Sequence, residues 1–176
     1  MRYLIFGLVL SFGLSAQKLS TRKGYVKFFS DAAVEEIEAE NTQCSSIINL
    51  DNGSFAFLVP IKAFQFEKAL MQEHFNENYM ESGKYPNASF KGNILSFESP
   101  DLSKDQNLKW KLKGRLTIHG VEREIEEEVM VRIKDGKLSL SSEFNLKVSD
   151  YGIDIPATKK DNISNDLKIT VKFQYD

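Results

Sequence analysis

Hydrophobic and polar residues alternate along most of the second half of the chain. The alternation runs through residues 108–120, 121–134, 138–148 and 167–175, with apolar side chains on one face and mainly charged or hydroxyl side chains on the other. A period of two predicts β-strands that bury one face and expose the other. Short turns, one of them carrying Asp135-Gly136, join the first three segments, so these strands are expected to form an antiparallel meander.

The first half of the chain carries shorter segments of the same kind. The strands expected there are Tyr25–Phe29, Val34–Ala39, Ile47–Leu50, Phe55–Ile61 and Ala88–Phe97. Together with the later segments they make eight or nine strands, with almost no connection of the parallel type. Strands as long as 108–120 suit a tilted, closed barrel better than a small sandwich. The expected fold class is all-β: a closed antiparallel β-barrel of about eight strands with one inserted amphipathic helix.

One segment, residues 66–82, breaks the alternation. Phe66, Leu70 and Phe75 follow one another near helical spacing, and Gly83 stands where a left-handed helix cap is expected. The segment is interpreted as a helix inserted between two strands, with a break near residues 76–78. An amphipathic helix beside a barrel is expected to close one end or lie over the mouth. No internal repeat or linker divides the chain, so a single domain is expected.

The N-terminus has the layout of a secretory signal peptide. Met1-Arg2 is short and positive, residues 3–14 are apolar or small, and Ser15-Ala16 supplies small residues. The apolar run is too short for a membrane span. Cleavage is expected after Ala16, which makes residues 17–176 the mature domain, without an integral membrane span, and the location periplasmic or secreted. The alternative is an uncleaved N-terminal anchor.

Composition narrows the classes of partner. The chain has 23 basic and 25 acidic residues and a formal net charge of −2, so it offers no positive field to hold nucleic acid. Its one cysteine, Cys44, excludes a disulfide within the chain and is expected to be a buried thiol. Thirteen phenylalanines and six tyrosines indicate either a large aromatic core or the wall of an apolar cavity.

Residues that carry catalytic chemistry are sparse. The two histidines, His74 and His119, are far apart in sequence and lie on different kinds of element, which does not favour a zinc site or a catalytic pair. The acidic runs 35–36 and 126–128 are interpreted as solvated strand faces. No nucleophile elbow or phosphate-binding loop is present in the sequence. The prediction is a protein without catalytic residues, metal or cofactor; an enzyme acting on a lipid through His74 is the minority hypothesis.

Three segments of the chain carry motifs that occur together in one known family. Residues 114–121 read GRLTIHGV. Within 61–90, the motif positions of a strand–helix segment are Phe64, Phe66, Leu70, His74, Phe75, Tyr85, Pro86 and Phe90. Residues 150–153 match a turn motif that follows the long strands. In these motifs the chain resembles the YceI-like family of periplasmic polyisoprenoid-binding proteins, and the resemblance spans about residues 24 to 176. It implies a lipocalin-like antiparallel barrel that holds a long isoprenoid, such as a polyprenyl phosphate or a quinone, without catalysis.

The alternation assigns candidate ligand-binding residues. Inward candidates for an apolar tunnel are Phe28, Phe55, Phe57, Val59, Phe90, Trp110, Leu112, Leu116, Val129, Val131, Phe144 and Leu146. Candidates for the mouth are Leu70, His74, Phe75 and Tyr79. Donors considered for a phosphate head group, most of them in the outward register, are Lys62, His74, Arg115, His119 and Arg123. The runner-up function is a barrel with a packed interior that acts on a protein partner, and a homodimer is left open.

Overall fold

The computed structural model describes residues 17–175. Its strands are β1 (Lys18–Asp31), β2 (Glu36–Asn49), β3 (Ser54–Pro60), β4 (Gln65–Phe66), β5 (Asn87–Ile94), β6 (Gln106–Ile118), β7 (Val121–Lys134), β8 (Lys137–Lys147) and β9 (Asp166–Gln174). One α-helix, α1 (Ala69–His74), runs into a π-helical turn, η2 (Phe75–Tyr79). Three single 3₁₀ turns complete the description: η1 (Ile61–Ala63), η3 (Val148–Tyr151) and η4 (Ala157–Lys159). The expected signal peptide lies outside the described residues.

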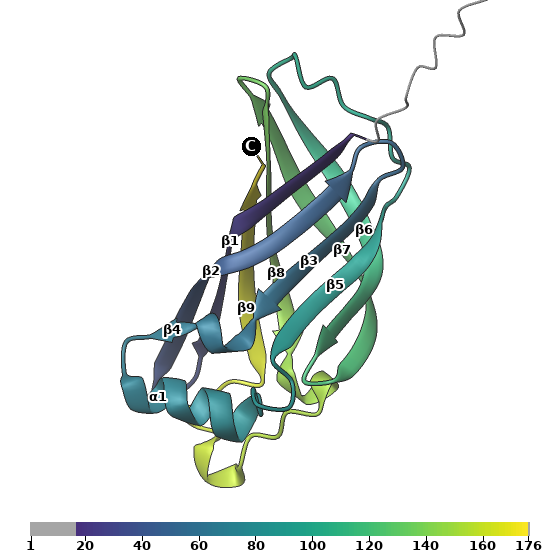
Figure 1. Cartoon of the computed structure of the whole chain (residues 1–176). Coiled ribbons are helices and arrows are strands. Elements are labelled where there is room, and N and C mark those ends of the chain that lie inside the picture. The colour runs from purple at the N-terminus through teal and green to yellow at the C-terminus, as the bar shows by residue number, and fades with distance from the viewer. Residues whose placement is uncertain (1–16, 176) are drawn as a thin grey trace, which may run out of the picture.

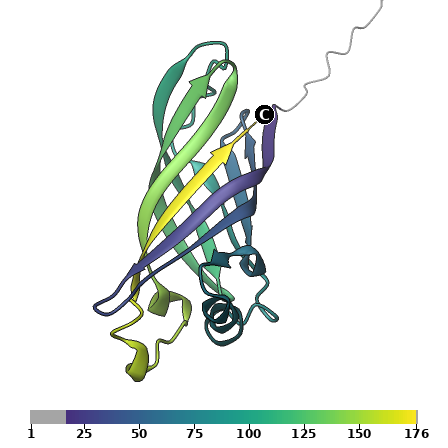
Figure 2. The same ribbon diagram turned by 90° about the vertical axis from the view of Figure 1, so that its left-hand side faces the viewer.

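Eight of the strands form an elongated, closed antiparallel barrel, which confirms the expected fold class (Figure 1). The order around the barrel is β1-β9-β8-β7-β6-β5-β3-β2, and pairing between β1 and β2 closes it. The short β4 adds to the outer part of β2. Figure 2 shows β9 between β1 and β8, so the first and last strands are neighbours in the barrel wall.

β1 is much longer than predicted, and the two short strands predicted at Val34–Ala39 and Ile47–Leu50 are parts of one strand, β2. The register of β1 against β2 shifts on either side of Gly24, which interrupts the alternation. On the inner side of β2, Asn41 and Ser46 are buried polar residues. The Asn41 amide donates to the carbonyl of Pro60 at 2.8 Å, and the Ser46 hydroxyl lies 2.7 Å from that of Tyr175. Because these polar groups are satisfied internally, they occupy inward positions that the pattern assigned to loops.

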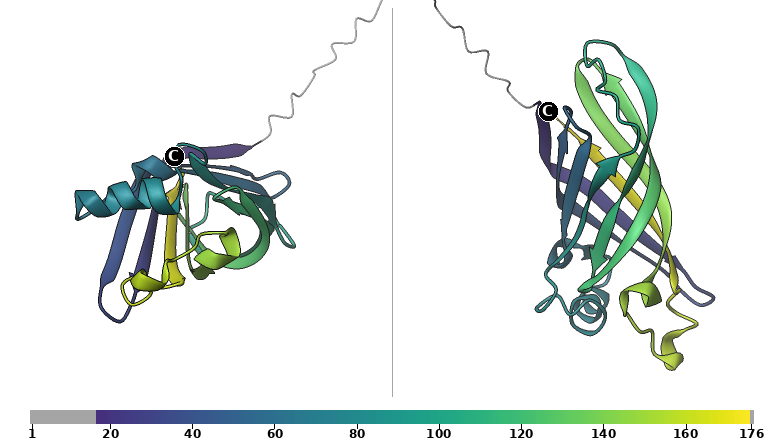
Figure 3. Two further views of the ribbon diagram at one scale, coloured as in Figure 1. Left: turned by 90° about the horizontal axis from the view of Figure 1, so that it is seen from below. Right: turned by 90° about the vertical axis from the view of Figure 1, so that its right-hand side faces the viewer.

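The inserted helix is shorter than expected and is capped differently. It begins at Ala69, three residues later than predicted, and changes to a π-helical turn at Phe75. The left-handed residue after the helix is Glu81, with φ of 42°, and not Gly83. The prediction of a Gly83 cap was wrong. Seen from below, α1 lies at the same end of the barrel as the segment that joins β8 to β9, residues 148–165 (Figure 3).

Two clusters of phenylalanine rings fill the interior. Phe55, Phe57, Phe90 and Phe173 meet inside the barrel, with ring centroids 5.5 to 6.4 Å apart. Phe28, Phe64, Phe66 and Phe75 meet near the helix, with centroids 5.0 to 5.7 Å apart. The heavy aromatic composition therefore serves both the barrel core and the helix end.

The barrel wall is incomplete between β7 and β8. β7 pairs with β6 along its whole length from Val121 to Ile133, but with β8 only from Met130 to Lys134. The two strands diverge toward the helix end (Figure 1). Residues 121–129 of β7 and 142–147 of β8 thus face each other across a gap in the hydrogen-bond ladder.

Candidate functional site

A cavity of about 210 Å³ lies at the helix end of the barrel. Its apolar wall is formed by Phe28, Ile37, Phe66, Met71, Phe75, Tyr79, Met80, Val148, Ile153, Ile155, Ile163 and Leu167. Its polar positions are Ser30, Glu35, His74, Lys159, Asn162 and Ser164. The wall combines β1, β2, α1 and the segment 148–165, so elements far apart in sequence enclose one apolar space.

Three polar contacts hold these elements together. The Lys68 ammonium lies 2.9 Å from a carboxylate oxygen of Glu35, which ties the helix region to the β1–β2 loop. In the same loop, the amide of Val34 donates to the carbonyl of Asp161 at 2.8 Å. The amide of Ser164 donates to the hydroxyl of Ser30 at 2.9 Å. These contacts tie the β1–β2 loop and β1 to the helix region and to the segment 148–165, which together line the cavity.

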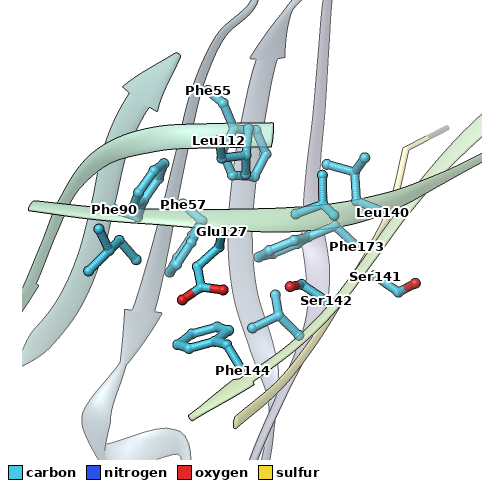
Figure 4. Close-up of a pocket in the computed structure, with 13 residues that line it drawn as sticks. Phe55, Phe57, Phe90, Leu112, Glu127, Leu140, Ser141, Ser142, Phe144 and Phe173 are labelled. Carbon is cyan, nitrogen blue, oxygen red and sulfur yellow. The ribbon is translucent and has the colours of Figure 1, made fainter. Parts of the chain in front are cut away.

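A second, smaller cavity of about 40 Å³ lies inside the barrel. Its wall is formed by Phe55, Phe57, Phe90, Leu112, Ile125, Glu127, Val129, Leu140, Ser141, Ser142, Phe144, Val171 and Phe173 (Figure 4). The rings of Phe57 and Phe90 stack here with centroids 5.5 Å apart. The two cavities share no lining residue. Both cavities are smaller than the usual volume of a small-molecule site, about 300–1,000 Å³. A ligand of that size would therefore have to displace side chains.

The structure places most of the predicted tunnel residues inside. Ten of the twelve are buried, and Phe57 and Phe144 are half-buried. Those that line the barrel cavity are Phe55, Phe57, Phe90, Leu112, Val129 and Phe144, whereas Phe28 lines the helix-end cavity. Leu116 and Leu146 line a cleft between β7 and β8. Val59, Trp110 and Val131 are buried in the core and line none of these three spaces.

Three of the four predicted mouth residues, His74, Phe75 and Tyr79, line the helix-end cavity. Leu70 does not, and its side chain is 61% exposed. The next residue, Met71, takes its place, because one step along a helix turns the side chain by about 100°. Ile153, Ile155 and Ile163 also line this cavity and were not predicted from the sequence. The one indication in the sequence was that these apolar side chains occur in a segment without the alternation of a strand.

The residues considered for a phosphate head group are not brought together. Lys62 is exposed, and Arg115 pairs with Glu122 at 3.3 Å. His119 lies 2.8 Å from a carboxylate oxygen of Glu81 and is largely buried. Of the five candidates only His74 lines the helix-end cavity.

The prediction that the whole acidic run 126–128 lies on a solvated strand face was wrong for Glu127. Glu126 faces outward and pairs with Lys111 on β6 at 2.7 Å. Glu127 belongs to the opposite register, with Val129 and Val131, and lines the barrel cavity. Arg123 shares this inward register, and its Nε donates to the carbonyl of Asp150 at 2.9 Å. The inward register of Arg123 and Glu127 could have been recognised from the sequence, because both residues interrupt the apolar series of odd-numbered positions that begins at Val121.

The carboxylate of Glu127 is in an unfavourable environment. It is half-buried, and among residues 17–175 it has neither a hydrogen bond nor an ion pair. Desolvation in the apolar wall raises the pKa of Glu127 above its usual range.

The described residues show no constellation for metal binding. Within 17–175, no three side chains of His, Cys, Asp or Glu come together as a metal site needs. Cys44 is a buried thiol, as expected, and burial raises its pKa to about 12. No helix in the same range is both long and apolar enough to span a membrane.

The fold and the cavities define the class: a closed antiparallel barrel with an apolar chamber at its helix end, of the lipocalin-like kind. The chain belongs to the YceI-like family, since the YceI-like domain profile matches residues 15–175. No curated protein matches the chain.

Solved structures share this fold. A polyisoprenoid binding domain from Saccharophagus degradans, described as implicated in plant cell wall breakdown, has a TM-score of 0.77 at 12% identity, over 92% of this chain and 99% of that one. BcnA of Burkholderia cenocepacia has a TM-score of 0.71 at 16% identity, over 86% and 96%. The YceI protein of Campylobacter jejuni has a TM-score of 0.57 at 17% identity, over 99% and 91%.

Proposed function

We propose that the protein is a periplasmic or secreted, non-catalytic carrier that holds one long apolar lipid of the isoprenoid type. The observation that carries the proposal is the apolar chamber at the helix end of a barrel lined by phenylalanines. Each buried methylene group contributes about 0.8 kcal/mol, so several prenyl units bind tightly with few polar contacts. The polyisoprenoid binding domain of S. degradans, which has the same fold, is consistent with this ligand class.

Ligand uptake requires the interior to adapt. The helix-end cavity of about 210 Å³ accepts only part of a long chain, and the barrel cavity of about 40 Å³ accepts almost none. Met71 and Met80 in the wall of the chamber are flexible side chains that adjust to a varied ligand surface. Beyond them, the chain must move the rings of the two phenylalanine clusters. Contacts between the ligand and the rings thus replace contacts of the rings with one another.

The first experiment combines export and extraction. The full chain, with its leader, is expressed, and the exported protein is purified without detergent. Mass spectrometry of the denatured protein and of its organic extract is expected to show loss of residues 1–16 and a co-purifying prenyl lipid. An empty extract, together with no uptake of an added C20 prenol by the exported protein, contradicts the carrier function.

A matched pair of variants tests the chamber itself. Met71→Trp places a large ring in the helix-end cavity and is expected to lower prenol binding at least about tenfold, since it removes several buried methylene contacts. Leu70→Trp makes the same change in size one residue away, on the exposed side of α1, and is expected to bind like the wild type. Equal binding by both variants would place the ligand elsewhere.

One observation favours a second function. The barrel interior is almost filled by its own rings. A barrel with a filled interior has little room for a ligand and would act through its surface on a protein partner. An exported protein that takes up no lipid and keeps its rings in place would support this alternative.

A further inference from the structure

The gap between β7 and β8 has well-defined ends. At one end the hydroxyl of Ser142 donates to the carbonyl of Glu128 at 2.7 Å, in place of the next rung of the ladder. At the other end the Nε of Arg123 donates to the carbonyl of Asp150 at 2.9 Å. If the register of Met130 with Ser141 continued, Glu127 would stand opposite Phe144. The strands separate where this pair would form.

The gap contains a cleft of about 290 Å³. It is lined by Leu116, Arg123, Glu124, Ile125, Glu127, Phe144, Asn145, Leu146, Lys147, Asp150 and Tyr151. Three of these residues, Ile125, Glu127 and Phe144, also line the barrel cavity. They form a border that is open to the outside on one side and faces the phenylalanine cluster on the other. A lipid chain in the barrel can therefore extend its polar end through this side of the wall.

Glu127 is the charged residue at this border. Figure 4 shows its carboxylate between the rings of Phe57 and Phe144, and every other residue that lines the barrel cavity is apolar or a serine. The two cations of the cleft have other contacts: Arg123 binds the carbonyl of Asp150, and Lys147 lies 3.9 Å from Asp166. Within residues 17–175, Glu127 has no such contact.

This arrangement favours one head-group chemistry. A half-buried carboxylate without a partner gains from a hydrogen-bond donor and repels a second negative charge. We propose that the β7–β8 cleft binds the head of the lipid, and that Glu127 selects a donor without negative charge, such as the hydroxyl of a prenol, over a phosphate. The proposal rests on the carrier function and adds to it the head-group class.

The test compares head groups on one chain length. Lipid-free wild-type protein is titrated calorimetrically with geranylgeraniol, geranylgeranyl monophosphate and geranylgeranylamine. The alcohol is expected to bind at least about tenfold more tightly than the phosphate, the size of one hydrogen bond to a charged group. An amine that binds more tightly still supports the same chemistry and identifies an ion pair. A phosphate that binds as tightly as the alcohol overturns the proposal.

Two variants attribute the selectivity to Glu127. Glu127→Gln removes the charge at constant size and is expected to lower alcohol affinity and to raise phosphate affinity, each by about threefold, so that the preference for the alcohol is lost. Glu128→Gln, on the exposed face of the same strand, is expected to keep the wild-type preference. A preference unchanged in Glu127→Gln overturns the role of Glu127 and leaves the carrier function standing. Wild-type protein that binds none of the three lipids overturns both.

Discussion

The rings of Phe57 and Phe90 stack in the middle of the barrel, with centroids 5.5 Å apart and an interplanar angle of 14°. They come from opposite positions on the neighbouring strands β3 and β5. Phe173, on β9, approaches Phe57 to 5.8 Å. The stack therefore occupies the middle of the barrel, which the chain of the proposed ligand would have to enter.

Phe57→Ala is expected to make the protein less stable and to raise its affinity for a prenol. Removing the half-buried ring should lower the free energy of unfolding of the lipid-free protein by about 2–4 kcal/mol, measured by urea denaturation. The space left beside Phe90 should raise the affinity for a C20 prenol. Phe97→Ala is the control, because Phe97 packs on Trp110 outside the barrel cavity. It should lose stability and gain no affinity. Equal affinities in both variants would show that the stack does not limit binding.

The long C-terminal strands were predictable from the sequence because one face of each is almost uniformly apolar. β6, from Gln106 to Ile118, matches the expected strand within two residues at each end. β1 and β2 were underestimated because their inward polar residues are satisfied by partners far away in sequence, such as Ser46 by Tyr175. In a pattern of period two, a polar residue indicates an exposed position, and a hydrogen-bond partner far away in sequence leaves no local trace in that pattern.

The candidate site was predictable in part for the same reason. The register of the strands gave the inward phenylalanines, but not which of them meet, because that depends on the closure of the barrel. Glu127 was missed because its neighbours Glu126 and Glu128 face solvent and made the whole run look solvated. The separation of β7 from β8 depends on tertiary packing and could not be predicted from the sequence of either strand.

The glycine in the GRLTIHGV segment is required by packing. Gly114 on β6 is paired with Gly92 on β5. A Cβ at Gly114 would contact the Lys91 carbonyl, and it would lie 2.6 Å from the Cα of Gly92 and 2.7 Å from the ring of Phe90. The two glycines thus leave room for the Phe90 ring against the sheet.

Gly114→Ala is therefore expected to destabilise the protein by about 1–3 kcal/mol, because backbone atoms must shift to admit the methyl group. The measurement is urea denaturation of the purified domain. Gly83→Ala is the matched control: nothing lies within 4 Å of its Cβ position, so its stability should stay within about 0.5 kcal/mol of the wild type. A neutral Gly114→Ala would show that β5 and β6 tolerate a wider separation.

Cys44 is expected to be chemically silent in the folded protein. Burial raises the pKa of its thiol from 9.0 to about 12, and the thiolate is the reactive form. At pH 8, the thiolate population falls about a thousandfold for this rise of three pKa units. Reaction with a disulfide reagent such as DTNB should therefore be slower by orders of magnitude than in urea-unfolded protein. Fast labelling under native conditions would require that the β1–β2 wall opens readily.

Glu127 gives the stability of the protein a dependence on pH of known sign. Desolvation raises its pKa in the folded state above the value of 4.5 expected for the unfolded chain. A carboxyl group of this kind favours folding in its neutral form, so its contribution is fully present below pH 4.5 and is lost as the pH rises through the folded-state pKa. Glu127→Gln keeps the neutral shape at every pH. Its thermal midpoint should therefore exceed that of the wild type at pH 7.5, and the difference should shrink toward pH 4.

Glu128→Gln supplies the comparison for this measurement, since it removes the same charge from the exposed face of β7. Its thermal midpoint should change less than that of Glu127→Gln at pH 7.5, because an exposed carboxylate keeps its water and is screened by salt. Bound prenol should reduce the advantage of Glu127→Gln, since a hydroxyl donated to the carboxylate replaces lost hydration. An equal gain from both substitutions would attribute the effect to the net charge of the strand and would remove the physical basis for a selective carboxylate in the cleft.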